Sequence, residues 1–72
     1  MERYRNAGGD SGVYAYEIGP DYITVMFSGT SRTYTYSYRK AGSGHVEHMK
    51  ILARNGSGLN SYINKHVKDL YD

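Results

Sequence analysis

The chain has 72 residues, which fits one small domain because typical domains run to roughly 100 to 150 residues. Hydrophobic residues make up 39% of it and charged residues 22%, with a formal net charge of +2, a composition typical of globular rather than disordered chains. It contains no cysteine, which excludes disulfides, thiolate metal sites and thiol nucleophiles. Because such a small chain lacks these stabilising devices, we expect a homo-oligomer.

The amino-terminal segment differs in character from the rest of the chain. Residues 1–11 carry charges and glycines without apolar periodicity, which predicts a flexible leader outside the core and a single domain over residues 12–72. No apolar run approaches the roughly 20 residues of a membrane-spanning helix, and the charged start is unlike a signal peptide. We therefore expect a cytoplasmic protein with no membrane partner.

The first half of the domain has the pattern of β-strands. Apolar and polar side chains alternate, Tyr, Thr, Val and Ile are frequent, and turn sequences occur at residues 19–21 and 28–31. The predicted strands run over about 12–18, 22–28 and 31–38. Since connections this short allow only hairpins, the three strands form an antiparallel meander.

The second hairpin has a defined register, whereas the first strand does not. A short turn sets Val25 opposite Tyr34 and Ile23 opposite Tyr36. The predicted core face comprises Ile23, Val25, Phe27, Tyr34 and Tyr36. The two tyrosines are therefore expected to pack against the rest of the domain rather than to stack on a ligand. In the first strand either Val13 and Ala15, or Tyr14, Tyr16 and Ile18, point inward.

After residue 38 the apolar period changes from two to about 3.6 residues, which predicts helices. The first is expected over residues 45–55 with Gly56 at its end, and the second over 58–70 with Ser57 as its N-cap. The apolar stripes comprise Val46, Met49, Leu52 and Ala53, then Leu59, Tyr62, Ile63, His66, Val67 and Leu70. Two α-helices packed on one face of a three-stranded antiparallel meander give an α+β fold.

Several short motifs follow one another in a distinctive order from Ser11 to Tyr71. They are ITVMF at residues 23–27, YTY at 34–36, HVEHMK at 45–50 and GLNSYIN at 58–64. In this order and spacing the chain resembles the KTSC domain, a short bacterial and phage module named for its place at the C-terminus of some lysyl-tRNA synthetases. The positions that match the family's central and closing motifs are Tyr34, Tyr36, Gly58, Asn60 and Ile63.

The resemblance implies this fold, and RNA binding without an established reaction. Residues 39–44 depart from the family, many members of which have a valine-proline pair there. The departure affects any function assigned to that linker in the wider family.

Positive charge is concentrated in the second half of the chain. Residues 1–38 have a net charge of −1, whereas residues 39–68 carry six basic side chains against Glu47 alone, a net charge of +5. The six are Arg39, Lys40, Lys50, Arg54, Lys65 and Lys68. Such a balance attracts phosphate-bearing ligands, although a solvated helix surface is the alternative interpretation.

The sequence Gly-Ser-Gly occurs twice, at residues 42–44 and 56–58, each time after an arginine and directly before a predicted helix. Helix amino ends expose free N–H groups, and glycines let a phosphate approach the backbone. The simpler alternative is that each Gly-Ser-Gly stretch ends one secondary-structure element and caps the next. The candidate ligand-binding residues are Tyr38, Arg39, Lys40, Gly42, Ser43, Gly44, His45, Arg54, Ser57, Gly58 and Asn60. The anion-binding hypothesis depends on the two stretches being close together and open to solvent.

The remaining polar residues do not suggest catalysis or a cofactor. His45 and His48 lie three residues apart and His66 lies on the second helix, but no further ligand has suitable spacing, so no metal is expected. His45 is expected to donate to an anion or to face solvent. The chain offers no paired carboxylates and no serine with an identifiable base, so we expect no enzymatic activity.

Three functional hypotheses follow. The first is a non-enzymatic binding module for a phosphate-bearing ligand, with RNA as the expected ligand. The second is a phage anti-defence protein that oligomerises and sequesters a nucleotide immune signal where glycine-rich helix starts meet at a subunit interface. The third is a protein–protein adaptor that uses the free sheet edge or the threonine-rich face.

Overall fold

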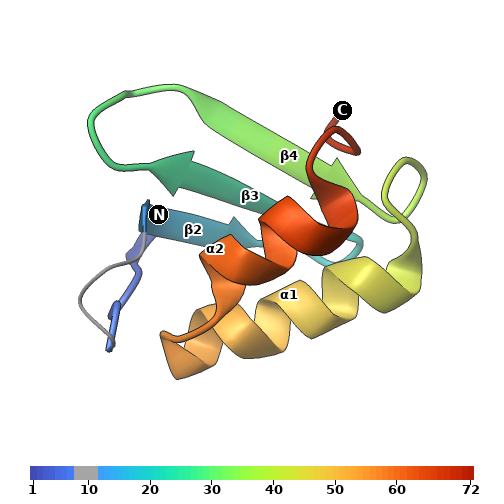
Figure 1. The fold of residues 1–72 in the computed structure, drawn as a ribbon. Helices are drawn as coiled ribbons and strands as arrows, with labels where there is room; N and C mark the ends of the chain where they lie inside the picture. Colours follow the sequence, from blue (N-terminus) through green and yellow to red (C-terminus); the bar gives the residue numbers. More distant parts are fainter. Residues whose placement is uncertain (8–11) are drawn as a thin grey trace.

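The computed structural model describes residues 1–7 and 12–72 and has an α+β fold, in which helices cover one face of an antiparallel sheet (Figure 1). The sheet contains, in spatial order, β1 (Glu2–Arg3), β2 (Val13–Ile18), β3 (Tyr22–Phe27) and β4 (Thr33–Ser37). The helical layer contains α1 (Ser43–Asn55) and α2 (Leu59–Tyr62), which continues as the π-helix η1 (Ile63–Val67). Within the described ranges no helix is long and apolar enough to cross a bilayer.

The sheet has four strands rather than the predicted three, because the amino-terminal segment adds one. Glu2 pairs with Tyr16 and Arg3 with Ala15, and Tyr4 is buried in the core with 4% of its surface exposed. The prediction of a leader outside the core is therefore wrong for residues 1–7. A two-residue strand is too short to show any alternation in the sequence. The rest of the predicted leader, residues 8–11, lies outside the described residues.

The hairpin of β3 and β4 has the predicted register. Ile23 lies opposite Tyr36 and Val25 opposite Tyr34. Three of these side chains are buried, and Tyr34 is half-buried at the margin of the core. The alternation and the short turn together therefore determined which face of this hairpin meets the helices.

Strand β2 combines the two registers that the sequence left open. Its pairing with β3 shifts between Val13 and Ala15, so Tyr14 is the extra residue of a β-bulge. Before the bulge Val13 lies opposite Phe27, and after it Tyr16 and Ile18 face the core. The bulge thus lets residues from both alternatives share one face.

The helix boundaries differ from the prediction at both starts. Helix α1 begins at Ser43, two residues early, and ends as expected before Gly56, whose N–H donates to the carbonyl of Leu52 at 2.9 Å. Helix α2 has Gly58 rather than Ser57 at its N-cap position. The helical conformation after α2 widens into η1 and ends at Val67, three residues before the predicted end.

The core lies between the sheet and the helices. Its largest fully buried side chains are Tyr36, Ile23, Met49, Leu59, Val13, Val25, Val46 and Val67. The predicted stripes supply most of the helical contribution. His66 is the exception, because it is exposed.

Burial of Tyr36 is expected to make the fold less stable at alkaline pH. Its side chain is 1% exposed, and burial raises its pKa to about 12 from the usual value of about 10. The unfolded chain therefore loses this proton first as the pH rises. We expect the stabilisation to be complete below pH 10 and to be lost between about pH 10 and 12. Denaturant titrations at pH 9, 10 and 11 should show this fall, and Tyr36→Phe should show a smaller one. Equal falls in both proteins would contradict the assignment.

Candidate ligand site at the amino end of α1

The two Gly-Ser-Gly stretches do not form one site, because they lie at opposite ends of α1 (Figure 1). The helix between them has 13 residues. At a rise of about 1.5 Å per residue, this separates the two stretches by about 20 Å. The prediction of a single anion site that uses both helix starts is therefore wrong for one chain.

The second stretch is a closed structural turn. The carbonyl of Gly56 accepts a hydrogen bond from the N–H of Ala7 at 2.7 Å, and the N–H of Leu59 donates to the hydroxyl of Tyr4 at 3.3 Å. A Cβ at Gly56 would lie 2.6 Å from the Cβ of Arg5. Residues 1–7 therefore pack against this turn. Ser57 and Gly58 themselves are exposed, but the N–H of Leu59 is already used by Tyr4, so this helix start is less open to an anion than the first one.

The other two candidate residues near this end also face away from the first stretch. Arg54 is in the last turn of α1 and lines a surface hollow with Glu2 and Glu17. Asn60 lies beside Gly12, where a Cβ would be 3.6 Å from its Oδ1. A cation near a helix carboxyl end interacts favourably with the helix dipole, which gives Arg54 a structural role.

The first stretch is open. Gly42 occupies the N-cap position of α1, where no side chain of the described residues forms a capping hydrogen bond, and the first turn contains no acidic residue. A Cβ built at Gly42 or Gly44 would meet no described atom within 4 Å. Ser43 is exposed, as are Arg39 and Lys40 in the preceding turn. This helix end therefore keeps its free N–H groups accessible beside two cations.

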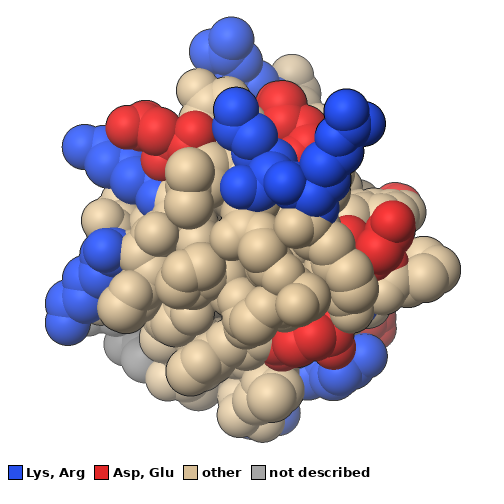
Figure 2. Space-filling model, turned by 90° about the vertical axis from the view of Figure 1, so that its right-hand side faces the viewer, with Lys and Arg blue, Asp and Glu red and all other residues tan. Residues whose placement is uncertain are grey.

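Figure 2 views the molecule from the end at which α1 begins. Lys and Arg side chains gather in the upper part of this face, interspersed with acidic ones, above a broad area without charged residues. An acidic group also lies near the turn before α1, since Ser37 Oγ donates to Asp72 Oδ1 at 2.7 Å. The positive character of this face is therefore local rather than continuous.

Tyr38, the predicted ligand contact, is 38% exposed, and its hydroxyl takes part in a hydrogen-bond network. Its hydroxyl donates to Glu47 Oε2, and Lys50 Nζ lies 2.7 Å from the same oxygen. Lys50 is 5% exposed and also donates to the carbonyl of Pro20 at 3.1 Å. The Lys50 ammonium and then the Tyr38 hydroxyl lower the pKa of Glu47. One of the six basic side chains of the second half is thus buried and paired.

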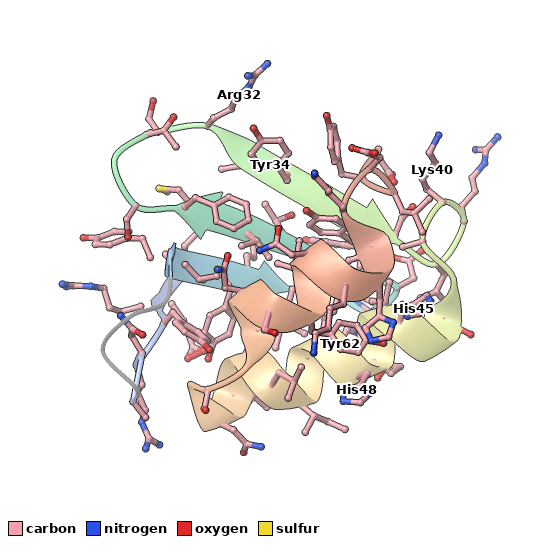
Figure 3. All side chains as sticks on the ribbon, in the orientation of Figure 1. Arg32, Tyr34, Lys40, His45, His48 and Tyr62 are labelled. Atoms are coloured by element: carbon pink, nitrogen blue, oxygen red, sulfur yellow. The ribbon has the colours of Figure 1, made fainter. Side chains whose placement is uncertain are left out.

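An unpredicted cluster of rings lies next to the open stretch. His45 Nδ1 is 2.7 Å from the hydroxyl of Tyr62, and the two side chains point toward one another (Figure 3). The ring centroids of His48 and His66 lie 4.6 and 4.5 Å from that of Tyr62. All three histidines of the chain therefore surround one tyrosine, and burial raises the pKa of Tyr62.

This cluster was not predicted because Tyr62 and His66 were assigned to the core stripe, and the histidines were considered as metal ligands and, for His45, as an anion donor or a solvent-facing residue. The spacings of three between His45 and His48, and four between Tyr62 and His66, were the available signal, since such pairs are neighbours on a helix. In residues 1–7 and 12–72, no group of three or more His, Cys, Asp or Glu side chains has an arrangement that could hold a metal ion.

The surfaces needed by a protein adaptor are partly occupied. The Asp72 N–H donates to the Thr35 carbonyl on the outer edge of β4 at 2.7 Å. On the face away from the helices, the hydroxyls of Thr24 and Thr35 are hydrogen-bonded to each other at 2.8 Å. The edge of β4 is thus less accessible than the sequence suggested.

No protein-family model, curated protein or solved structure matches this chain. The resemblance to the KTSC domain therefore stays a prediction.

Proposed function

We propose that this domain is a non-enzymatic binding module for a phosphate-bearing ligand, that the ligand is RNA, and that it binds at the amino end of α1. The observation that carries the proposal is the open helix start, uncapped by any described side chain and flanked by exposed Arg39 and Lys40. Free N–H groups and the positive end of the helix dipole favour an anion there. Arginine and lysine add the charge that dominates affinity for nucleic acid backbones.

The residues of this start are suited to close approach by a phosphate. Gly42 and Gly44 present backbone without a side chain, and the space around each is open in the described structure. Ser43 provides an exposed hydroxyl between them. The site thus combines backbone donors, a hydroxyl donor and two exposed cationic side chains, a set that serves binding but contains no nucleophile with a base.

We do not propose the nucleotide-sequestering oligomer. That hypothesis requires glycine-rich helix starts to meet at a subunit interface, and the start of α2 is already partly occupied, because the N–H of Leu59 donates to the Tyr4 hydroxyl. If the amino ends of α1 from several subunits met at an interface, light scattering would detect a stable oligomer.

Removing the two cations at the helix start tests the proposal. We expect Arg39→Ala with Lys40→Ala to weaken binding of a 12-nucleotide RNA at low salt by about 10- to 100-fold, and the slope of log K against log salt to fall by about 1.4, since each phosphate contact contributes about 0.7 on a single strand. Fluorescence anisotropy at several salt concentrations measures both quantities.

The matched control is Arg5→Ala with Arg54→Ala, which removes the same charge at the opposite end of α1. It is expected to change affinity by less than about threefold, through long-range electrostatics alone. Equal effects of the two double variants would contradict a site at the amino end of α1. Affinity that does not fall with salt in the wild type would contradict the proposed function itself.

A further inference from the structure

We infer that His48, Tyr62 and His66 form a base-stacking platform, and that the ligand of this domain is single-stranded RNA with unpaired bases. The inference rests on the proposed function, which places the phosphates at the amino end of α1. It adds a contact with the bases and thereby separates single-stranded from double-stranded RNA.

The rings of His48 and His66 each lie against the ring of Tyr62 in a tilted arrangement. The centroid of the Tyr62 ring is 4.6 Å from that of His48 and 4.5 Å from that of His66, with interplanar angles of 34° and 38°. These separations are at the close end of the range of about 4.5 to 7 Å for interacting aromatic rings. Tyr62 is the half-buried middle ring, whereas the two histidines are exposed. The end rings are therefore accessible to a further ring.

The stack is attached to the proposed phosphate site. His45, in the first turn of α1, is 2.7 Å from the Tyr62 hydroxyl through its Nδ1. His48 follows Ser43, the first residue of the helix, by five positions, or about 7.5 Å along the axis. A strand that places one phosphate at the amino end of α1 thus has its neighbouring nucleotides beside these rings.

The local backbone also distinguishes this place. His66 lies in η1, the five-residue π-helix that follows α2. π-Helical turns are rare and occur frequently at functional sites. Exposed Lys65 lies in the same helix and adds positive charge to it. An aromatic platform flanked by cations is the arrangement with which proteins bind single strands, because every base has a face that can stack.

The same geometry argues against a duplex as the ligand. Bases inside a double helix are stacked on each other and cannot reach a side-chain ring, so duplex RNA is recognised through its backbone and shape. The open helix start would then contribute to the affinity for a duplex, but the rings would not. Comparing the two forms of RNA therefore separates the contribution of the rings from that of charge.

The test uses His48→Ala with His66→Ala, which removes both exposed end rings and leaves the half-buried Tyr62 in place. We expect binding of a 12-nucleotide single-stranded RNA to weaken by roughly 5- to 100-fold, the usual effect of losing a stacked base. Binding of an RNA duplex of the same length should change by less than about twofold. The matched control is Ile51→Ala with Asn64→Ala, which alters two exposed residues of α1 and η1 outside the stack. It should leave both affinities unchanged.

A second measurement separates the failure of this inference from that of the proposed function. A strand that keeps its phosphates but lacks bases should bind the wild type and the histidine variant equally well. If the histidine variant loses the same affinity for single strand and duplex, or if the wild type does not prefer the single strand, the platform is wrong. If only Arg39→Ala with Lys40→Ala weakens binding, the proposed function stands without the platform. If no RNA binds the wild type, both are wrong.

Discussion

Replacing Tyr4 with alanine is expected to lower the free energy of unfolding by about 3 to 5 kcal/mol, the usual cost of truncating a buried aromatic residue. Tyr4 is 4% exposed and packs in the core beside the start of α2. Its hydroxyl also accepts a hydrogen bond from the N–H of Leu59. Because 72-residue domains are stabilised by only roughly 4 to 11 kcal/mol in total, the variant should be partly unfolded at room temperature or unfold at much lower denaturant concentration.

Chemical denaturation followed by circular dichroism measures this loss. Tyr14→Ala is the matched control, because Tyr14 is 43% exposed and its described ring contact is with the Arg3 guanidinium, 4.7 Å from the ring centroid. That contact contributes about 0.5 to 1 kcal/mol at an exposed site. Tyr4→Phe keeps the ring and should cost about 1 kcal/mol for the lost hydrogen bond. A similar loss at Tyr4 and Tyr14 would mean that residues 1–7 do not pack on the domain in solution.

Much of the sheet could be predicted because strand alternation and turn length are local features of the sequence. The pairing of Val25 with Tyr34 follows from alternation and from the shortness of the turn between their strands. The pairing of Glu2 with Tyr16 could not be predicted in the same way, since β1 is too short to contain a period. The bulge at Tyr14 was also hidden, because the strand's two tyrosines, Tyr14 and Tyr16, have side chains that suit either face.

The candidate site was predictable only in part, because identical motifs have different surroundings. Gly-Ser-Gly at residues 42–44 begins an exposed helix, whereas the same three letters at 56–58 form a turn covered by residues 1–7. The charge count also could not show that Lys50 is buried against Glu47. Long-range packing decides these cases, and sequence patterns of short range contain no information about it.

The ring cluster depends on another long-range quantity, the rotation of the continuous helix formed by α2 and η1 relative to α1. Each helix shows its own ring pair in the sequence, but whether His48 and Tyr62 face each other depends on how the two helices pack against the sheet. Prediction of such a cluster needs the helix orientation that the core imposes, and therefore the burial of residues such as Met49 and Ile63.

Gly56→Ala is expected to destabilise the domain by about 2 to 5 kcal/mol, through backbone strain of about 1 to 2 kcal/mol and overpacking of about 1 to 3 kcal/mol. Gly56 has φ of 74°, in the left-handed region that side chains rarely adopt. The added Cβ would also lie 2.6 Å from the Cβ of Arg5. Residues 1–7 would have to move, and the contact between the Ala7 N–H and the Gly56 carbonyl would be weakened with them.

Two glycine controls separate strain from overpacking when each alanine variant is denatured under the same conditions. Gly29 has φ of 84° but open space around it among the described residues, so Gly29→Ala should cost only the strain, about 1 to 2 kcal/mol. Gly44 lies within α1 in open space, so Gly44→Ala should stabilise the domain by about 0.5 to 1 kcal/mol. If Gly56→Ala costs no more than Gly29→Ala, residues 1–7 move aside without lowering the free energy of unfolding. Their packing against this turn would then contribute little to stability. A larger cost that Arg5→Gly relieves would instead locate the overpacking at that side chain, because coupling between neighbouring substitutions reports their contact.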